Sequence, residues 1–167
     1  MADKYAYCVW CNDKNEGKLL DKLRDGYGYE AFSPMRKRVL RNSQRTLIDE
    51  VPLTPGYVFF YTDTPIAKDK LNWLKQYYHI LEYTDGTSEL QGDDHRYAMW
   101  LFRHGGMVGL SQGIMDPETK YITFVSGPIL EFGEIKKFNR SKQYAVMECN
   151  FMGEPRLHSL SFEIVAA

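Results

Sequence analysis

The fold of the C-terminal part of the chain is decided by one stretch, Val125-Ser126-Gly127-Pro128-Ile129-Leu130-Glu131-Phe132-Gly133-Glu134-Ile135. Gly127-Pro128 predicts a turn at the start of a strand, because proline fixes its own φ and glycine tolerates a tight bend. Gly133 permits a backbone bend or a close approach that a β-carbon would block. Short runs of alternating apolar residues follow within about forty residues, the size of a small, strongly bent β-barrel.

We expect this barrel to span residues 121–167, with a core drawn from Phe124, Ile129, Phe132, Ile135, Val146 and Phe162. The preceding residues 106–120 carry glycine, serine, glutamine and Asp-Pro, a composition typical of a flexible linker. Residues 1–105 are long enough to close a core of their own. The sequence therefore predicts two domains joined by a linker.

Residues 1–105 predict an antiparallel sheet with helices packed on it. The expected strands are 5–11, 30–33, 57–60 and 79–83, with a long hairpin at 36–41 and 45–51 that turns at Asn42-Ser43. Three helices are expected: one over 14–24, one beginning at Thr64-Pro65, and one over 92–104 that Gly105-Gly106 ends. Leu19, Leu20 and Leu23 mark the buried face of the first helix.

These motifs resemble the NusG family of transcription elongation factors. The stretch from Val125 is similar to the family's KOW module, an SH3-like barrel. The N-terminal motifs are the aromatic strand Tyr7–Cys11, Glu16 in the first helix, and Pro55-Gly56-Tyr57-Val58 on the central strand. The resemblance implies an α+β fold class, with an N-terminal NusG-type antiparallel sheet with helices and a C-terminal KOW SH3-like β-barrel.

Within the family, the chain looks more like the specialised paralogues RfaH and LoaP than like housekeeping NusG. Phe32-Ser33-Pro34-Met35, followed by a basic hairpin, is similar to their pattern, and LoaP is the preferred match. This resemblance implies a transcription elongation and antitermination factor that suppresses pausing and termination at specific operons. Two alternatives remain open: a general NusG-like factor, and a ribosome- or RNA-binding KOW protein with no polymerase role.

Tyr57 and Phe59 alternate with Val58 and Phe60, so the two pairs lie on opposite faces of a strand. From the alternation alone, the outer pair is either core or an exposed partner site. The resemblance favours a site, because the matching aromatics of the family line a cavity that grips the clamp helices of the largest RNA polymerase subunit. Ile80 and Cys8 are matched to the same cavity.

The hairpin carries a basic cluster, Arg36, Lys37, Arg38, Arg41 and Arg45, with no acidic residue between Ala31 and Ile48. Such a cluster is either a solvated face or a site that attracts phosphates. Lys14 extends the patch from the first helix. The resemblance implies nucleic-acid contact by this domain, with structured nascent RNA as the preferred ligand and non-template DNA as the alternative.

The strand–turn segment Cys149–Arg156 matches the family segment that contacts ribosomal protein S10 or Rho, which makes Phe151, Met152 and Glu154 the candidate contacts. Glu154 occupies a place where housekeeping NusG commonly has a basic residue. A charge inversion at a contact site disfavours the original partner, so Rho recruitment is expected to be weak. The alternative is that Phe151 and Met152 pack the barrel.

Composition excludes several other classes of protein. The formal net charge of −1 argues against a polycation. Cys8 and Cys11 are three residues apart in an expected strand, so their side chains point to opposite faces and cannot share a metal or a disulfide. No catalytic motif, signal peptide or transmembrane run is evident. We therefore expect a cytoplasmic, monomeric, non-enzymatic protein without cofactor or metal.

Overall fold

The computed structural model describes residues 3–12, 15–131 and 133–165. Lys14 and Phe132, singled out above, lie outside the described residues. The chain forms two compact units. The first contains the residues up to Pro34 together with Thr54–Gly106, and the second contains Met35–Leu53 together with the residues from Met107 onward.

The first unit is built on a four-stranded sheet with strand order β2-β5-β1-β6. The strands are β1 (Tyr5–Trp10), β2 (Glu30–Phe32), β5 (Tyr57–Thr62) and β6 (His79–Ile80), and neighbouring strands are antiparallel. β5 pairs with β1 and with β2, and every residue of β5 after Tyr57 is buried. A run of apolar residues of this kind is typical of a strand with both faces covered.

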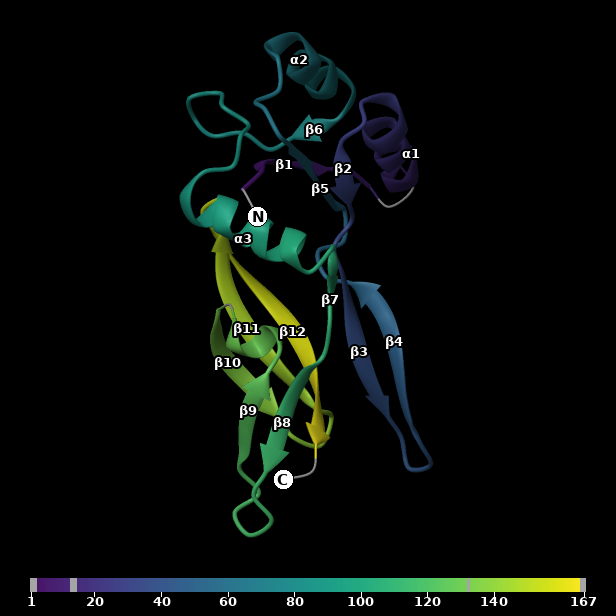
Figure 1. Cartoon of the computed structure of the whole chain (residues 1–167), viewed down its shortest axis with the longest axis vertical. Coiled ribbons are helices and arrows are strands. Elements are labelled where there is room, and N and C mark those ends of the chain that lie inside the picture. Colours follow the sequence, from purple (N-terminus) through teal and green to yellow (C-terminus); the bar gives the residue numbers. More distant parts are fainter. Residues whose placement is uncertain (1–2, 13–14, 132, 166–167) are drawn as a thin grey trace. The chain divides into compact units, whose positions relative to one another are not determined.

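Helices cover the two faces of this sheet (Figure 1). On one face, Leu19 of α1 (Glu16–Asp21), Leu23 of the following π-helical turn (Lys22–Gly26) and Leu74 of α2 (Lys68–Tyr77) pack against Val9, Val58 and Phe60. On the other face lies α3 (Gly92–Arg103). The Tyr97 ring of α3 is 6.0 Å from the Phe59 ring, and the Tyr61 hydroxyl donates to the Ala98 carbonyl at 2.7 Å.

The predicted elements of the first unit are present with differences in their bounds, and the first helix is α-helical only over Glu16–Asp21 before the π-helical turn Lys22–Gly26. The second helix begins at Lys68 rather than at Thr64-Pro65, because the Thr62 hydroxyl donates to the Thr64 carbonyl at 2.7 Å and fixes a turn there. The strand predicted over 79–83 is limited to His79–Ile80. The glycine end of α3 is confirmed, since Gly106 has a φ of +80° and its N–H donates to the Leu101 carbonyl at 3.0 Å.

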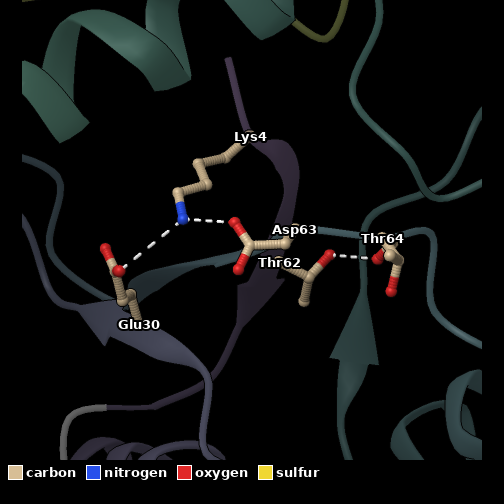
Figure 2. Close-up of polar contacts among 5 residues, drawn as sticks. All are labelled: Lys4, Glu30, Thr62, Asp63 and Thr64. Carbon is tan, nitrogen blue, oxygen red and sulfur yellow. Dashed lines mark hydrogen bonds and ion pairs between the residues drawn. The ribbon is translucent and has the colours of Figure 1, made fainter. Parts of the chain in front are cut away.

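An ionic clip joins three strand ends of this sheet (Figure 2). The ammonium of Lys4, just before β1, contacts the carboxylate of Asp63 after β5 and lies 3.8 Å from the Glu30 carboxylate at the start of β2. The hydrogen bond to Asp63 raises the pKa of Lys4. These contacts link the residue before β1 to the end of β5 and the start of β2.

The second unit contains a curled five-stranded sheet with strand order β10-β11-β12-β8-β9 (Figure 1). Its strands are β8 (Ser111–Met115), β9 (Ile122–Ser126), β10 (Glu134–Asn139), β11 (Tyr144–Phe151) and β12 (Glu154–Val165). β12 and β8 are parallel, and the other pairs are antiparallel. The predicted α+β fold class, with a curled C-terminal sheet that is consistent with a KOW-like barrel, is confirmed.

On β10 and β11 the buried residues are not the ones predicted for the core. Phe162 is buried between the rings of Phe138 and Phe124, whose centroids lie 5.4 and 5.1 Å from its own. On β11 the buried residues are Ala145, Met147, Cys149 and Phe151. Val146 therefore lies on the other face of the strand, and Ile135 is 46% exposed. Ile129 is buried as predicted.

Residues 106–120 contain two strands in place of the predicted flexible linker. β7 (Met107–Val108) pairs with β3 (Met35–Arg41), and β8 lies inside the five-stranded sheet between β12 and β9. Glycine is required within β8 by packing, because a Cβ on Gly113 would lie 2.5 Å from Cγ2 of Ile122. At Gly113, the glycine that indicates a linker thus reflects a close strand contact.

The predicted basic hairpin forms from β3 and β4 (Thr46–Pro52), and it belongs to the second unit. Its turn is fixed by the Asn42 side chain, whose Oδ1 accepts the N–H groups of Gln44 and Arg45 at 2.9 Å each. The Val39 N–H donates to the Ser161 hydroxyl of β12 at 3.1 Å. Along the chain the hairpin precedes residue 105, but its contacts are with the C-terminal strands.

The turn between β9 and β10 provides a test of this fold. Gly127 has a φ of +104°, and a Cβ there would lie 2.4 Å from the Ser111 Cα. Gly127→Ala is therefore expected to lower the free energy of unfolding by about 3 kcal/mol, from backbone strain and overpacking. Urea denaturation measures the loss.

The matched control is Gly153→Ala in the β11–β12 turn. Gly153 also has a positive φ, +78°, but a Cβ there would meet no atom within 4 Å. This variant is expected to lose only about 1 kcal/mol. Equal losses for the two variants would contradict the close packing of Gly127 on β8.

Candidate functional site

Three of the four residues predicted to form an aromatic cavity share one face of the first sheet. Cys8 and Phe59 are direct partners across the β1–β5 ladder, and Tyr57 lies two residues from Phe59 on the same face. Cys8 and Phe59 are buried, with Phe59 against Tyr97 of α3, whereas Tyr57 is partly exposed. Only Tyr57 of this group can be reached from solvent.

Ile80 lies on the opposite face from these residues. It pairs with Val9 in the β1–β6 ladder and is buried in the cluster that contains Leu19, Leu23 and Leu74. The structure therefore does not bring Ile80 together with Tyr57 and Phe59.

Trp10 is a surface aromatic that the sequence analysis did not select. It pairs with Tyr57 across the β1–β5 ladder, is 48% exposed, and lies edge-on to His79 at 6.4 Å. A Cβ on Gly56 would lie 3.3 Å from the indole nitrogen, so glycine lets the ring lie against the backbone. We call Trp10, Tyr57 and His79 the aromatic strip. The sequence could have indicated Trp10, because it lies two residues after Cys8 in the same strand and therefore shares its face.

Acidic residues of β4 lie opposite the basic residues of β3, just beyond the acid-free stretch from Ala31 to Ile48. Arg38 forms a two-pronged pair with Asp49, with distances of 3.0 Å from Nε to Oδ1 and 2.7 Å from Nη2 to Oδ2. This hydrogen bonding lowers the pKa of the Asp49 carboxyl. Lys37 stands opposite Glu50 in the β3–β4 ladder. The cross-strand register thus offsets part of the positive charge.

Two other hairpin arginines approach the C-terminal strands. Arg41 donates to the Gln143 side-chain carbonyl at 3.2 Å, a neutral partner that leaves its charge uncompensated. Arg36 is half-buried, and its burial and the neighbouring Arg38 lower its pKa. Arg45 is exposed beside the turn. Lys14, the predicted extension of the patch, lies outside the described residues.

The β11–β12 turn places its three predicted contact residues differently. Phe151 is buried, and the Arg156 guanidinium lies 5.7 Å from the centre of its ring. Met152 is partly exposed with a φ of +51°, and Glu154 is exposed. Phe151 is thus buried within the unit, whereas Met152 and Glu154 retain exposed surface.

A model of the family described as "NusG: Transcription termination factor nusG" matches residues 4–97, which is more than half of the chain. The chain belongs to the NusG family. The matched segment contains the aromatic strip and the whole basic hairpin. Proteins of this family are non-enzymatic transcription elongation and termination factors that generally bind RNA polymerase. No curated protein matches this NusG-family sequence.

Three further observations concern other classes of site in this NusG-family protein. Among the described residues, no group of His, Cys, Asp and Glu side chains is arranged to hold a metal ion. Cys11 is buried with Val9 in the cluster against α1 and α2, whereas Cys8 lies on the face of α3, so the alternation predicted for the two thiols is confirmed. None of the helices in the described ranges is long and apolar enough to span a membrane.

The burial of His158 on β12 can be tested through the pH dependence of stability. Burial, Arg156 and Arg36 lower the pKa of His158 from 6.5 to about 4. The unfolded chain therefore protonates His158 at a higher pH than the folded protein, and stability falls as the pH drops from about 6.5 toward about 4.

Between about pH 7 and about pH 4.5 this histidine should account for a loss of about 2 kcal/mol in the free energy of unfolding. Urea denaturation of the parent protein and His158→Gln at both pH values measures its share, because all other titrating groups are common to the two proteins. The same loss in both proteins would show that His158 is not held neutral beside the two arginines.

Proposed function

We propose that this NusG-family protein is a specialised antitermination factor of the LoaP or RfaH type. It binds the clamp helices of the largest RNA polymerase subunit and suppresses pausing and termination at specific operons. The observation that carries the proposal is the exposed aromatic strip, Trp10, Tyr57 and His79, on the sheet of the matched segment. It offers a surface anchor for polymerase, the partner that the family generally binds.

The chemistry of the aromatic strip suits the recognition of a helical tip. Trp and Tyr are enriched among the residues that dominate binding energy at interfaces. Phe59 and Cys8 lie buried on the same face, each two residues along its strand from Tyr57 or Trp10. In this proposal Tyr57 contacts the polymerase directly, Phe59 and Cys8 support it, and Ile80 stabilises the opposite face of the sheet.

A factor of this kind acts by changing the populations of polymerase states. Binding that favours a closed clamp over a paused, open clamp shifts the equilibrium by the difference in affinity for the two states. No chemical step by the factor is required. The proposed function therefore depends only on the geometry of its contacts.

The second proposed contact is nucleic acid on the basic hairpin. Arg41 and Arg45 stand at the turn end of the hairpin, and the charge of Arg41 is met by a neutral amide. Arg36, Lys37 and Arg38 continue the basic side toward the base, with Lys14 as a further candidate from sequence. Structured nascent RNA is the preferred ligand and non-template DNA the alternative.

The third proposed contact lies at the β11–β12 turn, where Met152 and Glu154 face ribosomal protein S10, and Glu154 disfavours Rho. The alternative of a purely RNA-binding barrel has less support on β10. There Lys136 is held by Glu134 at 3.5 Å and by Glu148 at 3.1 Å, which offsets its charge.

The polymerase contact is tested by truncating the aromatic strip. Trp10→Ala and Tyr57→Ala are each expected to weaken binding to purified RNA polymerase by about 2 kcal/mol, or roughly thirtyfold, because both remove an interface aromatic. Binding is measured by titration with labelled protein.

Tyr77→Ala is the matched control, since Tyr77 is 61% exposed on α2 and lies outside the strip. Thermal unfolding of all three variants should stay close to that of the parent protein. Unchanged polymerase binding by both strip variants would rule out this face as the contact.

Antitermination is tested by transcription through a terminator with purified polymerase. The protein is expected to raise the fraction of read-through transcripts from templates that encode its leader RNA and not from templates with a scrambled leader. Arg45→Ala should lower this gain, because a phosphate contact is lost at the exposed turn. Lys136→Ala serves as the control, as Lys136 is ion-paired on β10. Increased termination would instead identify a general termination factor.

A further inference from the structure

The second unit contains a cavity of about 400 Å³ between strand β3 of the hairpin and the strands β11 and β12. Arg36, Arg38 and Arg41 line it from the hairpin, and Lys142, Tyr144 and Ser159 line it from the C-terminal sheet. We propose that this cavity binds one nucleotide of a single-stranded nucleic acid, with its phosphate held by the cations. The proposal deepens the nucleic-acid contact of the proposed function and rests on it.

The walls of the cavity are held in place by hydrogen bonds. The Val39 N–H donates to the Ser161 hydroxyl at 3.1 Å, and Arg41 donates to Gln143 at 3.2 Å, so the hairpin is joined to β12 and to the β10–β11 turn. Gln143 in turn donates to the Phe162 carbonyl at 3.1 Å. A cavity whose walls are fixed before the ligand arrives loses little freedom on binding.

The charge of the cavity points to an anion. Of the residues that line it, four are cations and none is acidic. Asp49 offsets Arg38, whereas Arg41 donates to the neutral side-chain amide of Gln143. The backbone N–H of Lys142 donates to the Asn139 side chain at 2.9 Å, which fixes the turn that carries Lys142. Burial and the Arg38 charge lower the pKa of Arg36, so a bound phosphate would relieve an unfavourable buried charge.

The remaining lining groups suit a base and a sugar. Tyr144, Val39 and Leu40 also line the cavity, and Ser159 and Ser161 bring hydroxyl groups to it. Stacking on an aromatic ring is the usual way in which proteins hold single-stranded bases. The volume lies within the roughly 300–1,000 Å³ typical of small-ligand sites, which admits a nucleotide but not a double helix.

Binding of the full-length protein to a fluorescein-labelled twelve-nucleotide single-stranded RNA, and to DNA of the same sequence, tests the proposal by anisotropy. Lys142→Glu is expected to weaken binding by about tenfold, because a charge-assisted contact is replaced by repulsion. The slope of log affinity against log salt should fall by about 0.7. Tyr144→Leu should weaken binding while leaving the salt slope unchanged, since it removes stacking and not charge.

The control is Lys137→Glu, the same change of charge on exposed β10 and outside the cavity. Equal effects of Lys142→Glu and Lys137→Glu would overturn the proposal, as would an unchanged affinity for Tyr144→Leu. The proposal would also be overturned if Lys142→Glu weakened the binding of a labelled poly-glutamate peptide alone. That result would assign the cavity to an acidic protein segment. A loss with RNA, DNA or both supports the proposal and identifies the strand that the cavity accepts.

The outcome is separable from that of the polymerase proposal. Trp10→Ala is expected to retain parent affinity for the labelled strand, and Lys142→Glu is expected to retain parent affinity for polymerase. If the parent protein fails to bind polymerase but shows Lys142-dependent strand binding, the polymerase proposal fails and the cavity remains. If polymerase binds and the strand does not, the cavity proposal is overturned and the polymerase contact stands.

Discussion

The first unit depends on the burial of β5 on both of its faces. Val58 and Phe60 face α1 and α2, whereas Phe59 and Tyr61 face α3, and β1 and β2 pair with β5 on either side. A slip of one residue would exchange these two sets of side chains, so burial on both faces fixes the register. That register places Trp10 opposite Tyr57 and gives the aromatic strip its position. The proposed polymerase contact is thus a consequence of how the core is closed.

The packing of this face also decides which of its residues are buried and which can contact a partner. Phe59 and Cys8 are buried because α3 covers the middle of their face, and Tyr57 and Trp10 retain exposure toward one end of the ladder. Alternation along a strand assigns all four residues to one face. It does not say which part of that face a helix covers. The division of roles therefore follows from where α3 packs.

In the second unit, the charge of the hairpin is set by contacts that are distant in sequence. Asp49 and Glu50 oppose Arg38 and Lys37 through the strand register, and Gln143 meets Arg41 from a turn about a hundred residues later in the chain. The basic cluster is consequently divided into a compensated part and an uncompensated part. Arg36, Arg38 and Arg41 of this cluster line a cavity to which the C-terminal sheet adds Lys142 and Tyr144. In the sequence the basic residues of the hairpin form one uniform cluster. In the structure, packing of the hairpin on β12 brings three of its arginines to one cavity.

The sequence by itself determined the α+β class, the order of most elements, the Gly127-Pro128 and Gly133 turns and the family, because alternation, caps and glycine chemistry act over a few residues. It also determined that Tyr57 and Phe59 share a face, whereas the β1–β5 register placed Cys8 with them. Only the tertiary structure decided that residues 106–120 contribute β7 and β8, since a glycine demanded by packing at Gly113 cannot be told from a glycine that loosens a linker. It also decided that Ile80 faces the opposite core, that β11 buries Met147 rather than Val146, and that the hairpin packs on β12. Each of these outcomes depends on contacts between residues far apart in the chain, which no local pattern encodes.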